Sequence, residues 1–164
     1  MFVRLVAATD APALASLLDE TIARGGTTAF QQPFTPRRLA ESMLVGRGVI
    51  CCFVAEESDG SLGGFQSLVR SEDLPNHVSD IATFSRVGQT QKGIGSQLFA
   101  ATQTEARRQG LRAISATIRD DNVGGLAFYS RLGFTDHNIH RAVPLLDGTT
   151  IDRISKRYVL GSGP

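Results

Sequence analysis

A short glycine-containing segment from Thr90 to Ser96, TQKGIGS, has residue types that suit the binding of an anion. It follows an apolar segment typical of a β-strand and begins an amphipathic segment that is typical of a helix. The first backbone N–H groups of a helix have no partner within it, and the helix dipole adds positive charge there. The segment therefore predicts a phosphate-binding helix start, with Lys92 beside it.

Two common nucleotide motifs do not fit this segment. The dinucleotide fingerprint needs a third glycine where Leu98 stands, and the phosphate loop of nucleotide triphosphatases needs a lysine after Gly93, whereas Lys92 precedes it. Neither mismatch excludes the binding of a pyrophosphate without a metal ion. For the segment taken alone, a flexible helix start without any ligand is the alternative.

A second segment, Asn122 to Phe134 (NVGGLAFYSRLGF), gives the first one a more specific meaning. Asn122 heads an expected helix, where its side chain can cap the helix or donate to a ligand amide. Tyr129 lies on the apolar side of that helix. The alternatives for Tyr129 are a buried core residue with a satisfied hydroxyl and a functional hydroxyl.

Together the two segments resemble the GNAT superfamily of acyl-CoA N-acyltransferases. The family's pyrophosphate loop, Gln/Arg-x-x-Gly-x-Gly/Ala, falls on residues 90–95, and its later motif, Asn-x-x-Ala-x-x-(Phe/Leu)-Tyr-x-x-x-Gly-Phe, falls on residues 122–134. Thr90 stands where Gln or Arg is usual, and Gly125 stands where Ala is usual. Short fragments at residues 27–30 and 140–143 look like the phosphinothricin acetyltransferase-like branch, whose enzymes acetylate small amino compounds.

The resemblance implies that acetyl-CoA binds as a co-substrate where the strand expected over 78–87 diverges from the strand over 112–118. The pantetheine amides would pair with the backbone of the first strand, and the pyrophosphate would lie on the N–H groups of the glycine segment. The resemblance implies acetyl-CoA contacts at Ile81, Thr83, Ser85, Val87, Gln91, Lys92, Gly93, Ile94, Gly95, Ser96, Asn122 and Phe128.

Acetyl transfer to an amine needs a neutral amine, a polarised thioester carbonyl and a proton for the departing thiolate. The resemblance implies that Tyr129 lies near the sulfur as general acid or hydrogen-bond donor. Asp80 stands where the phosphinothricin-like branch has a Glu, the expected base. Asp is one methylene shorter, so a solvated strand-end carboxylate is the alternative. His77 is a rival base.

The predicted acceptor is a primary amine of a small molecule or an amino acid. The alternatives are acetylation of a protein N-terminus or lysine, and a non-catalytic CoA-binding module. The acceptor pocket is expected between the loops at residues 25–36 and 70–77. The family likeness also makes a homodimer plausible.

The periodicity predicts an α/β (α+β) fold: a mixed, twisted sheet of six to seven strands with helices on both faces, in a single domain over residues 1–164. Asp10 is expected to cap the first helix. Strands are expected at 2–6, 49–56, 62–70, 78–87, 112–118, 134–143 and 149–160, and helices at 10–24, 35–46, 93–109 and 122–132.

Composition narrows the partners further. The net charge of +1 predicts neither nucleic acid nor a membrane surface as a partner, and the short apolar runs predict no membrane span. The first residues lack the pattern of a signal peptide, so we expect a cytoplasmic protein. Cys51 and Cys52 are expected to be small core residues on opposite faces of a strand. The histidines lack metal-ligand spacing, so no metal is expected.

Overall fold

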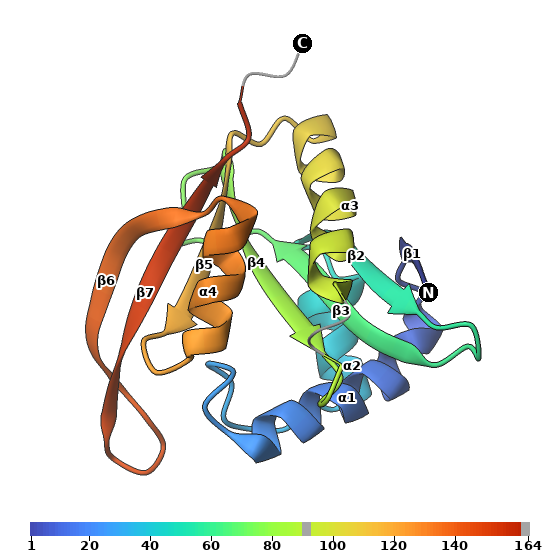
Figure 1. Ribbon diagram of the computed structural model, residues 1–164, viewed down its shortest axis with the longest axis horizontal. Coiled ribbons are helices and arrows are strands. Elements are labelled where there is room, and N and C mark those ends of the chain that lie inside the picture. The colour runs from blue at the N-terminus through green and yellow to red at the C-terminus, as the bar shows by residue number, and fades with distance from the viewer. Residues whose placement is uncertain (90–92, 162–164) are drawn as a thin grey trace.

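A computed structural model describes residues 1–89 and 93–161 and contains one seven-stranded sheet (Figure 1). The strands lie in the order β1-β2-β3-β4-β5-β7-β6. Neighbouring strands are antiparallel except β4 and β5, which are parallel. The strands are β1 (Phe2–Leu5), β2 (Val49–Glu56), β3 (Leu62–Val69), β4 (Val78–Ser85), β5 (Ala113–Arg119), β6 (Thr135–Pro144) and β7 (Thr150–Val159).

Helices cover both faces of this sheet, which confirms the predicted fold class (Figure 1). The helices α1 and α2 pack on one face, whereas α3 and α4 pack on the other. The helices are α1 (Ala11–Arg24), α2 (Pro36–Leu39), α3 (Ile94–Arg108) and α4 (Val123–Leu132), and a 3-10 turn (Ala8–Asp10) and a π-helical turn (Ala40–Leu44) adjoin α1 and α2. No described helix is both long and apolar enough to cross a membrane.

The helix boundaries follow from local chemistry. At the start of α2, the Thr35 hydroxyl accepts a hydrogen bond from the Arg38 N–H at 3.1 Å. The first helix ends at Gly25 and α4 ends at Gly133, both with a positive φ that favours glycine. The structure contradicts the predicted cap at Asp10, whose carboxylate accepts from Arg4 and from the Ala7 N–H.

Alternation along β2 separates the two cysteines, as predicted. Cys51 packs in the core beneath α3 and α4, whereas Cys52 packs in the core beneath α1 and α2. Both thiols are free and buried. Burial raises the pKa of Cys51 to about 12, so neither the location nor the ionisation of this thiol suits a nucleophile.

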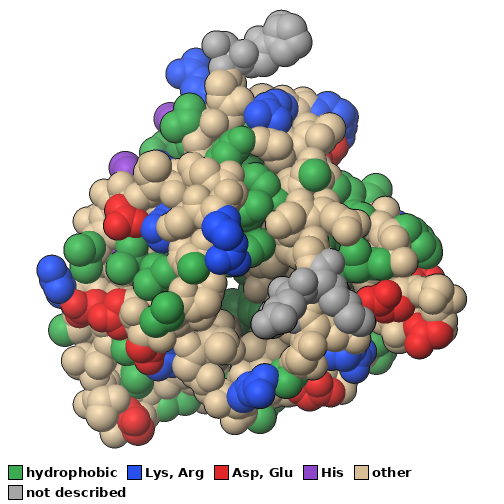
Figure 2. Space-filling view, viewed as in Figure 1, with side chains coloured by type: hydrophobic (Ala, Val, Ile, Leu, Met, Phe, Trp, Pro, Cys, Tyr) green, Lys and Arg blue, Asp and Glu red, His purple; other side chains and the backbone are tan. Residues whose placement is uncertain are grey.

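The strands β4 and β5 lie side by side over only three residue pairs, which join Val78–Asp80 to Ala113–Ser115. Beyond these pairs β5 continues beside β7, and no further Cα partners connect β4 to β5 within these fully described strands. The edge of β4 from Ile81 to Ser85 therefore faces a gap. Figure 2 shows the surface hollowed at this place, between α4 and β4.

The strand β4 is shorter than predicted. It ends at Ser85, and the chain turns over Arg86 to Gln89, where the Gln89 N–H donates to the Arg86 carbonyl at 3.0 Å. Val87 therefore lies in the turn, with 37% of its surface exposed, rather than in the strand.

Candidate active site

The residues of β4 point alternately to the two faces of the sheet beside the gap. Ile81 packs in the core beneath α3 and α4, whereas Ala82 and Phe84 pack in the core beneath α1. By the same alternation Thr83 and Ser85 lie on the α3–α4 face, and Asp80 lies on the α1–α2 face. Polar groups of β4 are thus available on both sides of the gap.

Tyr129 and Thr83 meet on the α3–α4 face. The Tyr129 hydroxyl lies 2.9 Å from Thr83 Oγ1, which accepts a hydrogen bond from Gln66 Nε2 at 2.9 Å. Because Thr83 already accepts from Gln66, its own hydroxyl proton can go to the Tyr129 oxygen. The Tyr129 proton then stays available to a third group in the gap.

Burial fixes the protonation state of Tyr129. Only 7% of this residue is exposed, and burial raises the pKa of its hydroxyl, with a further contribution from the negative charge of Asp80. The Thr83 hydrogen bond acts in the opposite direction without overcoming burial. At neutral pH Tyr129 is therefore a hydrogen-bond donor rather than a phenolate.

Asp80 stands at the last paired position of β4 before the gap. It lies opposite Val69 of β3 and opposite Ser115 of β5. Burial raises the pKa of its carboxyl to about 6, although the positive charge of Arg157 opposes this shift. A carboxylate with this pKa is ionised at pH 7 and accepts a proton more readily than an ordinary aspartate.

The start of α3 supplies free backbone donors. Gly93 precedes the helix in a left-handed conformation, and the first helical hydrogen bond joins the Gln97 N–H to the Gly93 carbonyl at 3.2 Å. The N–H groups of Ile94, Gly95 and Ser96 therefore have no partner within the described helix. The predicted contacts at Gln91 and Lys92, and the departure at Thr90, lie outside the described residues.

Gly95 has a packing reason as well. A Cβ atom at this position would lie 2.6 Å from Phe128 Cε2, so only glycine lets the Phe128 ring approach α3 this closely. Phe128 also stacks edge-to-face on Tyr129, with ring centroids 4.9 Å apart. The start of α3 and the middle of α4 are thus held together beside the gap, and the side chain of Ile94 is buried in the core.

Comparison with known proteins assigns the family. The model of the acetyltransferase (GNAT) family matches residues 18–134, which include the β4–β5 gap, the start of α3 and Tyr129. The chain belongs to the GNAT acetyltransferase family. It is an acyltransferase that uses acetyl-CoA as its co-substrate.

Individual relatives of this GNAT enzyme are distant in sequence. YwnH of Bacillus subtilis (strain 168), provisionally named a phosphinothricin acetyltransferase, is 25% identical over 154 residues, which cover 93% of this chain and 94% of the relative. A phosphinothricin acetyltransferase from Sinorhizobium meliloti, solved in complex with AcCoA, has a TM-score of 0.85 at 20% identity and covers 99% of this chain and 89% of its own. A ribosomal-protein-alanine N-acetyltransferase from Brucella melitensis has a TM-score of 0.83 at 18% identity, with 97% and 99% covered. These structural likenesses show the fold.

The side-chain amide of Asn122 in the GNAT enzyme forms two hydrogen bonds within the protein. Its Oδ1 accepts from the Gly125 N–H at 2.9 Å, and its Nδ2 donates to the Thr27 carbonyl at 3.2 Å. A Cβ at Gly125 would lie 2.5 Å from that Nδ2, which explains why glycine stands here instead of alanine. Asn122 thus caps α4 and ties it to the loop after α1.

That loop covers the Asp80 side of the sheet. Phe30 packs against Phe84 of β4 with ring centroids 6.1 Å apart, and Gln31 Oε1 accepts from the Leu146 N–H of the β6–β7 turn at 2.8 Å. A pocket of about 250 Å³ lies between the loop and this turn. The predicted second wall, the loop of residues 70–77, instead lies at the opposite end of β4, where the His77 carbonyl accepts from the Arg112 N–H.

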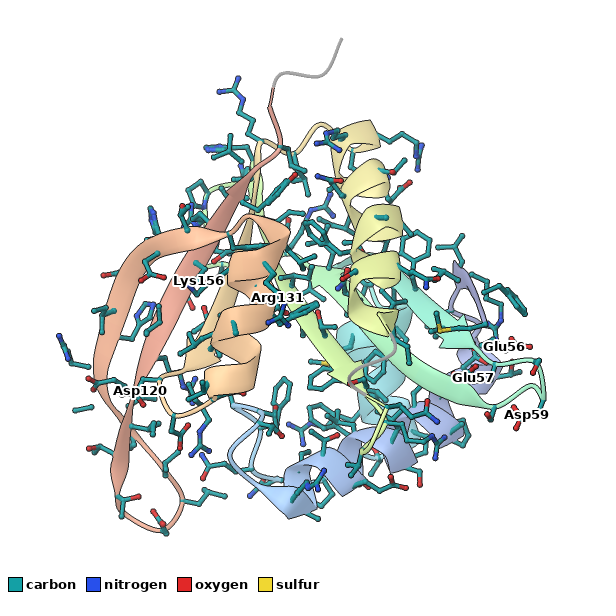
Figure 3. All side chains as sticks on the ribbon, in the orientation of Figure 1. Glu56, Glu57, Asp59, Asp120, Arg131 and Lys156 are labelled. Atoms are coloured by element: carbon teal, nitrogen blue, oxygen red, sulfur yellow. The ribbon has the colours of Figure 1, made fainter. Side chains whose placement is uncertain are left out.

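Two residues that the motifs did not single out lie at the candidate site. Gln66 belongs to the hydrogen-bond chain, and its only sequence signal is an amide within the apolar strand β3. Arg131 lies two residues beyond Tyr129 and projects from α4 toward the gap (Figure 3). It is exposed, so its positive charge is accessible to a ligand.

The donors present fit the phosphate and amide groups of acetyl-CoA: the α3 N–H groups, the open edge of β4 and Arg131. A metal site has no comparable support. Within residues 1–89 and 93–161, no cluster of three or more His, Cys, Asp or Glu side chains could hold a metal ion.

Proposed function

We propose that this enzyme transfers the acetyl group of acetyl-CoA directly to the primary amine of a small molecule or an amino acid. One observation carries the proposal: Tyr129 and Asp80 lie on opposite faces of the sheet, at the edge where β4 leaves β5. A thioester entering this gap has a proton donor on one side and a proton acceptor on the other.

The α3–α4 face would hold acetyl-CoA. The N–H groups of Ile94 to Ser96 would bind the pyrophosphate, with Arg131 as a second positive group. The backbone of Ile81, Thr83 and Ser85 would pair with the pantetheine amides along the open strand edge. Three further residues are weaker candidates for contacts with acetyl-CoA: Val87, Phe128 and Asn122. Val87 lies in an exposed turn, and the Asn122 amide already caps α4.

The acceptor amine would approach from the Asp80 side. Its nitrogen attacks the thioester carbonyl carbon, a C–N bond forms and the C–S bond breaks. The Asp80 carboxylate takes the N–H proton, and the Tyr129 hydroxyl gives its proton to the departing sulfur. Transfer of the Asp80 proton to Tyr129 through solvent restores both groups, so the net products are an amide and a thiol.

Asp80 is the better base than His77. The exposed His77 lies before β4, in the loop whose backbone anchors β5. Asp80 stands next to the gap, and its raised pKa of about 6 suits a base. An aspartate here is shorter than a glutamate, so a bridging water is expected between the carboxylate and the amine.

The covered acceptor side favours a small acceptor over a protein chain. The loop after α1 is tied to α4 through Thr27 and to the β6–β7 turn through Gln31. Such ties favour a bounded pocket rather than an open peptide groove.

We also propose that the protein forms a homodimer, which light scattering tests. A cytoplasmic location is a further proposal, which cell fractionation tests.

The test combines binding and turnover. Calorimetry should give a micromolar dissociation constant for acetyl-CoA, and thiol release should accelerate with members of a panel of amines and amino acids. Acetylation confined to peptides would replace the small-molecule assignment. Binding without acceleration by any amine or peptide would indicate a non-catalytic CoA-binding module, and no binding at millimolar acetyl-CoA would contradict the proposal altogether.

A further inference from the structure

Two arginines of β7 differ from the other arginines of the chain. Five arginines are half-buried: Arg4, Arg86, Arg119, Arg153 and Arg157. The first three donate to a carboxylate or a backbone carbonyl. Within the described residues, Arg153 and Arg157 each have a buried Nε without a hydrogen-bond partner. A buried, unpaired guanidinium donor is costly, so a ligand or solvent must satisfy it.

The position of Arg157 relates it to the proposed acceptor site. Asp80, Ser115 and Arg157 are Cα partners in one row across β4, β5 and β7, so their side chains lie on the same face. Two strand spacings separate the Cα atoms of Asp80 and Arg157 by about 10 Å. In this row the small residue Ser115 stands between them.

The two charges lie on the same face of the sheet without direct contact. Asp80 and Arg157 form no ion pair, although the Arg157 charge acts on the Asp80 carboxyl. A carboxylate and a guanidinium at this separation complement a molecule that carries an amino group and an acid group a few atoms apart. A simple amine would meet Asp80 equally well but would leave the guanidinium unpaired.

We propose that Arg157 binds an acid group of the acceptor, so that the substrate is a zwitterionic amino acid rather than a simple amine or a peptide N-terminus. The inference rests on the proposed function, because it takes Asp80 as the partner of the reacting amine. The acid is a carboxylate or a phosphorus oxyacid, both of which a guanidinium binds through two parallel hydrogen bonds.

The experiment compares acceptors that differ only in the acid group. Amino acids, their carboxamides and the corresponding decarboxylated amines are assayed by thiol release, with aminophosphonates as a separate arm that identifies the acid. The wild type should favour the acid over the carboxamide by at least about tenfold in kcat/KM. Arg157→Gln should abolish this preference, mainly through KM, and Arg157→Lys should restore part of it.

Arg153→Gln is the matched control. Arg153 lies on the same face of the same strand and is also half-buried, with an Nε that has no hydrogen-bond partner. Its Cα partners in the sheet are Arg119 and His140, so it lies outside the row of Asp80. This variant should keep the wild-type preference. An equal acid preference in the wild type and in folded Arg157→Gln, or an equal loss in both variants, would overturn the proposal.

A binding arm separates this inference from the proposed transfer. Calorimetry measures amino acid binding to the CoA complex of the wild type and of Arg157→Gln. Binding that Arg157→Gln loses would uphold the acid site even if no acetyl transfer were detected. Efficient transfer that Arg157→Gln leaves unchanged would uphold the transferase and reject the acid site.

Discussion

The hydroxyl of Tyr129 is directed by the two residues behind it. Because Thr83 accepts from Gln66, it can donate to Tyr129 and leave the phenolic proton available to the gap, and burial keeps that proton on the oxygen. This arrangement suits a donor to a departing thiolate, which needs a proton only while the C–S bond breaks.

Replacing Tyr129 by Phe should lower kcat by about 100-fold or more. The dissociation constant for acetyl-CoA should change less than about threefold, because the ring and its packing against Phe128 are retained. Rapid-mixing thiol release and calorimetry measure the two effects. An unchanged kcat would remove Tyr129 from the mechanism, and Tyr158→Phe, which alters the other tyrosine, is the control.

Asp80 should govern the acidic side of the pH profile. Because its carboxyl must be ionised to accept a proton, kcat/KM should fall as the pH decreases through about 6, the pKa that burial gives this group in the free enzyme. Asp80→Asn should lose this limb together with most of the activity. The same limb in the variant and the wild type would assign the base to another group.

The same burial should make Asp80 a cost to stability. Its carboxyl titrates near 6 in the folded chain against an ordinary value of 3.8, so the folded state holds the proton more tightly. The free energy of unfolding should therefore decrease as the pH rises from about 4 to 6, by at most about 3 kcal/mol.

Asp80→Asn should remove that penalty. The variant should be about 1–3 kcal/mol more stable than the wild type at pH 8, and the difference should shrink below pH 4. Urea denaturation at the two pH values measures it, with the exposed loop variant Asp73→Asn as the control. A less stable Asp80→Asn protein at pH 8 would show that the carboxylate is stabilised in the folded chain.

The helix α4 depends on how its first turn meets the loop after α1. Asn122 caps this turn and reaches the Thr27 carbonyl, and its amide lies where a side chain at Gly125 would project. Gly124, one residue earlier, has open space around its missing side chain. These adjacent glycines offer a matched comparison within one helix.

Gly124→Ala should stabilise the protein by about 0.5–1 kcal/mol, because alanine is the better helix former. Gly125→Ala should lose this gain, because its methyl group displaces the Asn122 amide from Thr27. Thermal unfolding compares the two variants. Equal stabilisation by both substitutions would show that the Asn122 contact contributes nothing.

Short-range sequence patterns predicted most helices and strands, but they did not predict which residues contact each other across the fold. Gly25, Gly133 and the Asn122 cap follow from short-range chemistry, and the structure confirms them. The predicted cap at Asp10 was wrong because its carboxylate accepts hydrogen bonds from Arg4 and the Ala7 N–H instead of from the first turn of α1. The prediction that the strand extends to Val87 was wrong because the apolar pattern continues past the point where the chain turns.

The site depends on contacts between residues that are distant in the chain. The family resemblance indicated Tyr129 and Asp80, but no local pattern joins Gln66 to Thr83, or Arg157 to the row of Asp80. These relationships arise from the register of the sheet. A single sequence contains that register only implicitly, so the acceptor side could not be predicted from it.

The GNAT fold brings two separate surfaces to one gap in the sheet. The α3–α4 face offers N–H groups, Arg131 and the Tyr129 hydroxyl, and the α1–α2 face offers Asp80 beneath a tethered loop. Because the strands β4 and β5 separate after three pairs, a thioester can be reached from both faces. Direct transfer without a covalent enzyme intermediate is the chemistry that this arrangement supports.

The most direct test measures both products of the wild-type reaction. Purified enzyme is incubated with acetyl-CoA and a panel of amino acids, and free CoA and N-acetylated product are quantified by mass spectrometry. We predict that the two products appear in equal amounts and faster than the background hydrolysis of acetyl-CoA. Release of CoA without an N-acetylated product, or no release with any amine in the panel, would contradict the assignment.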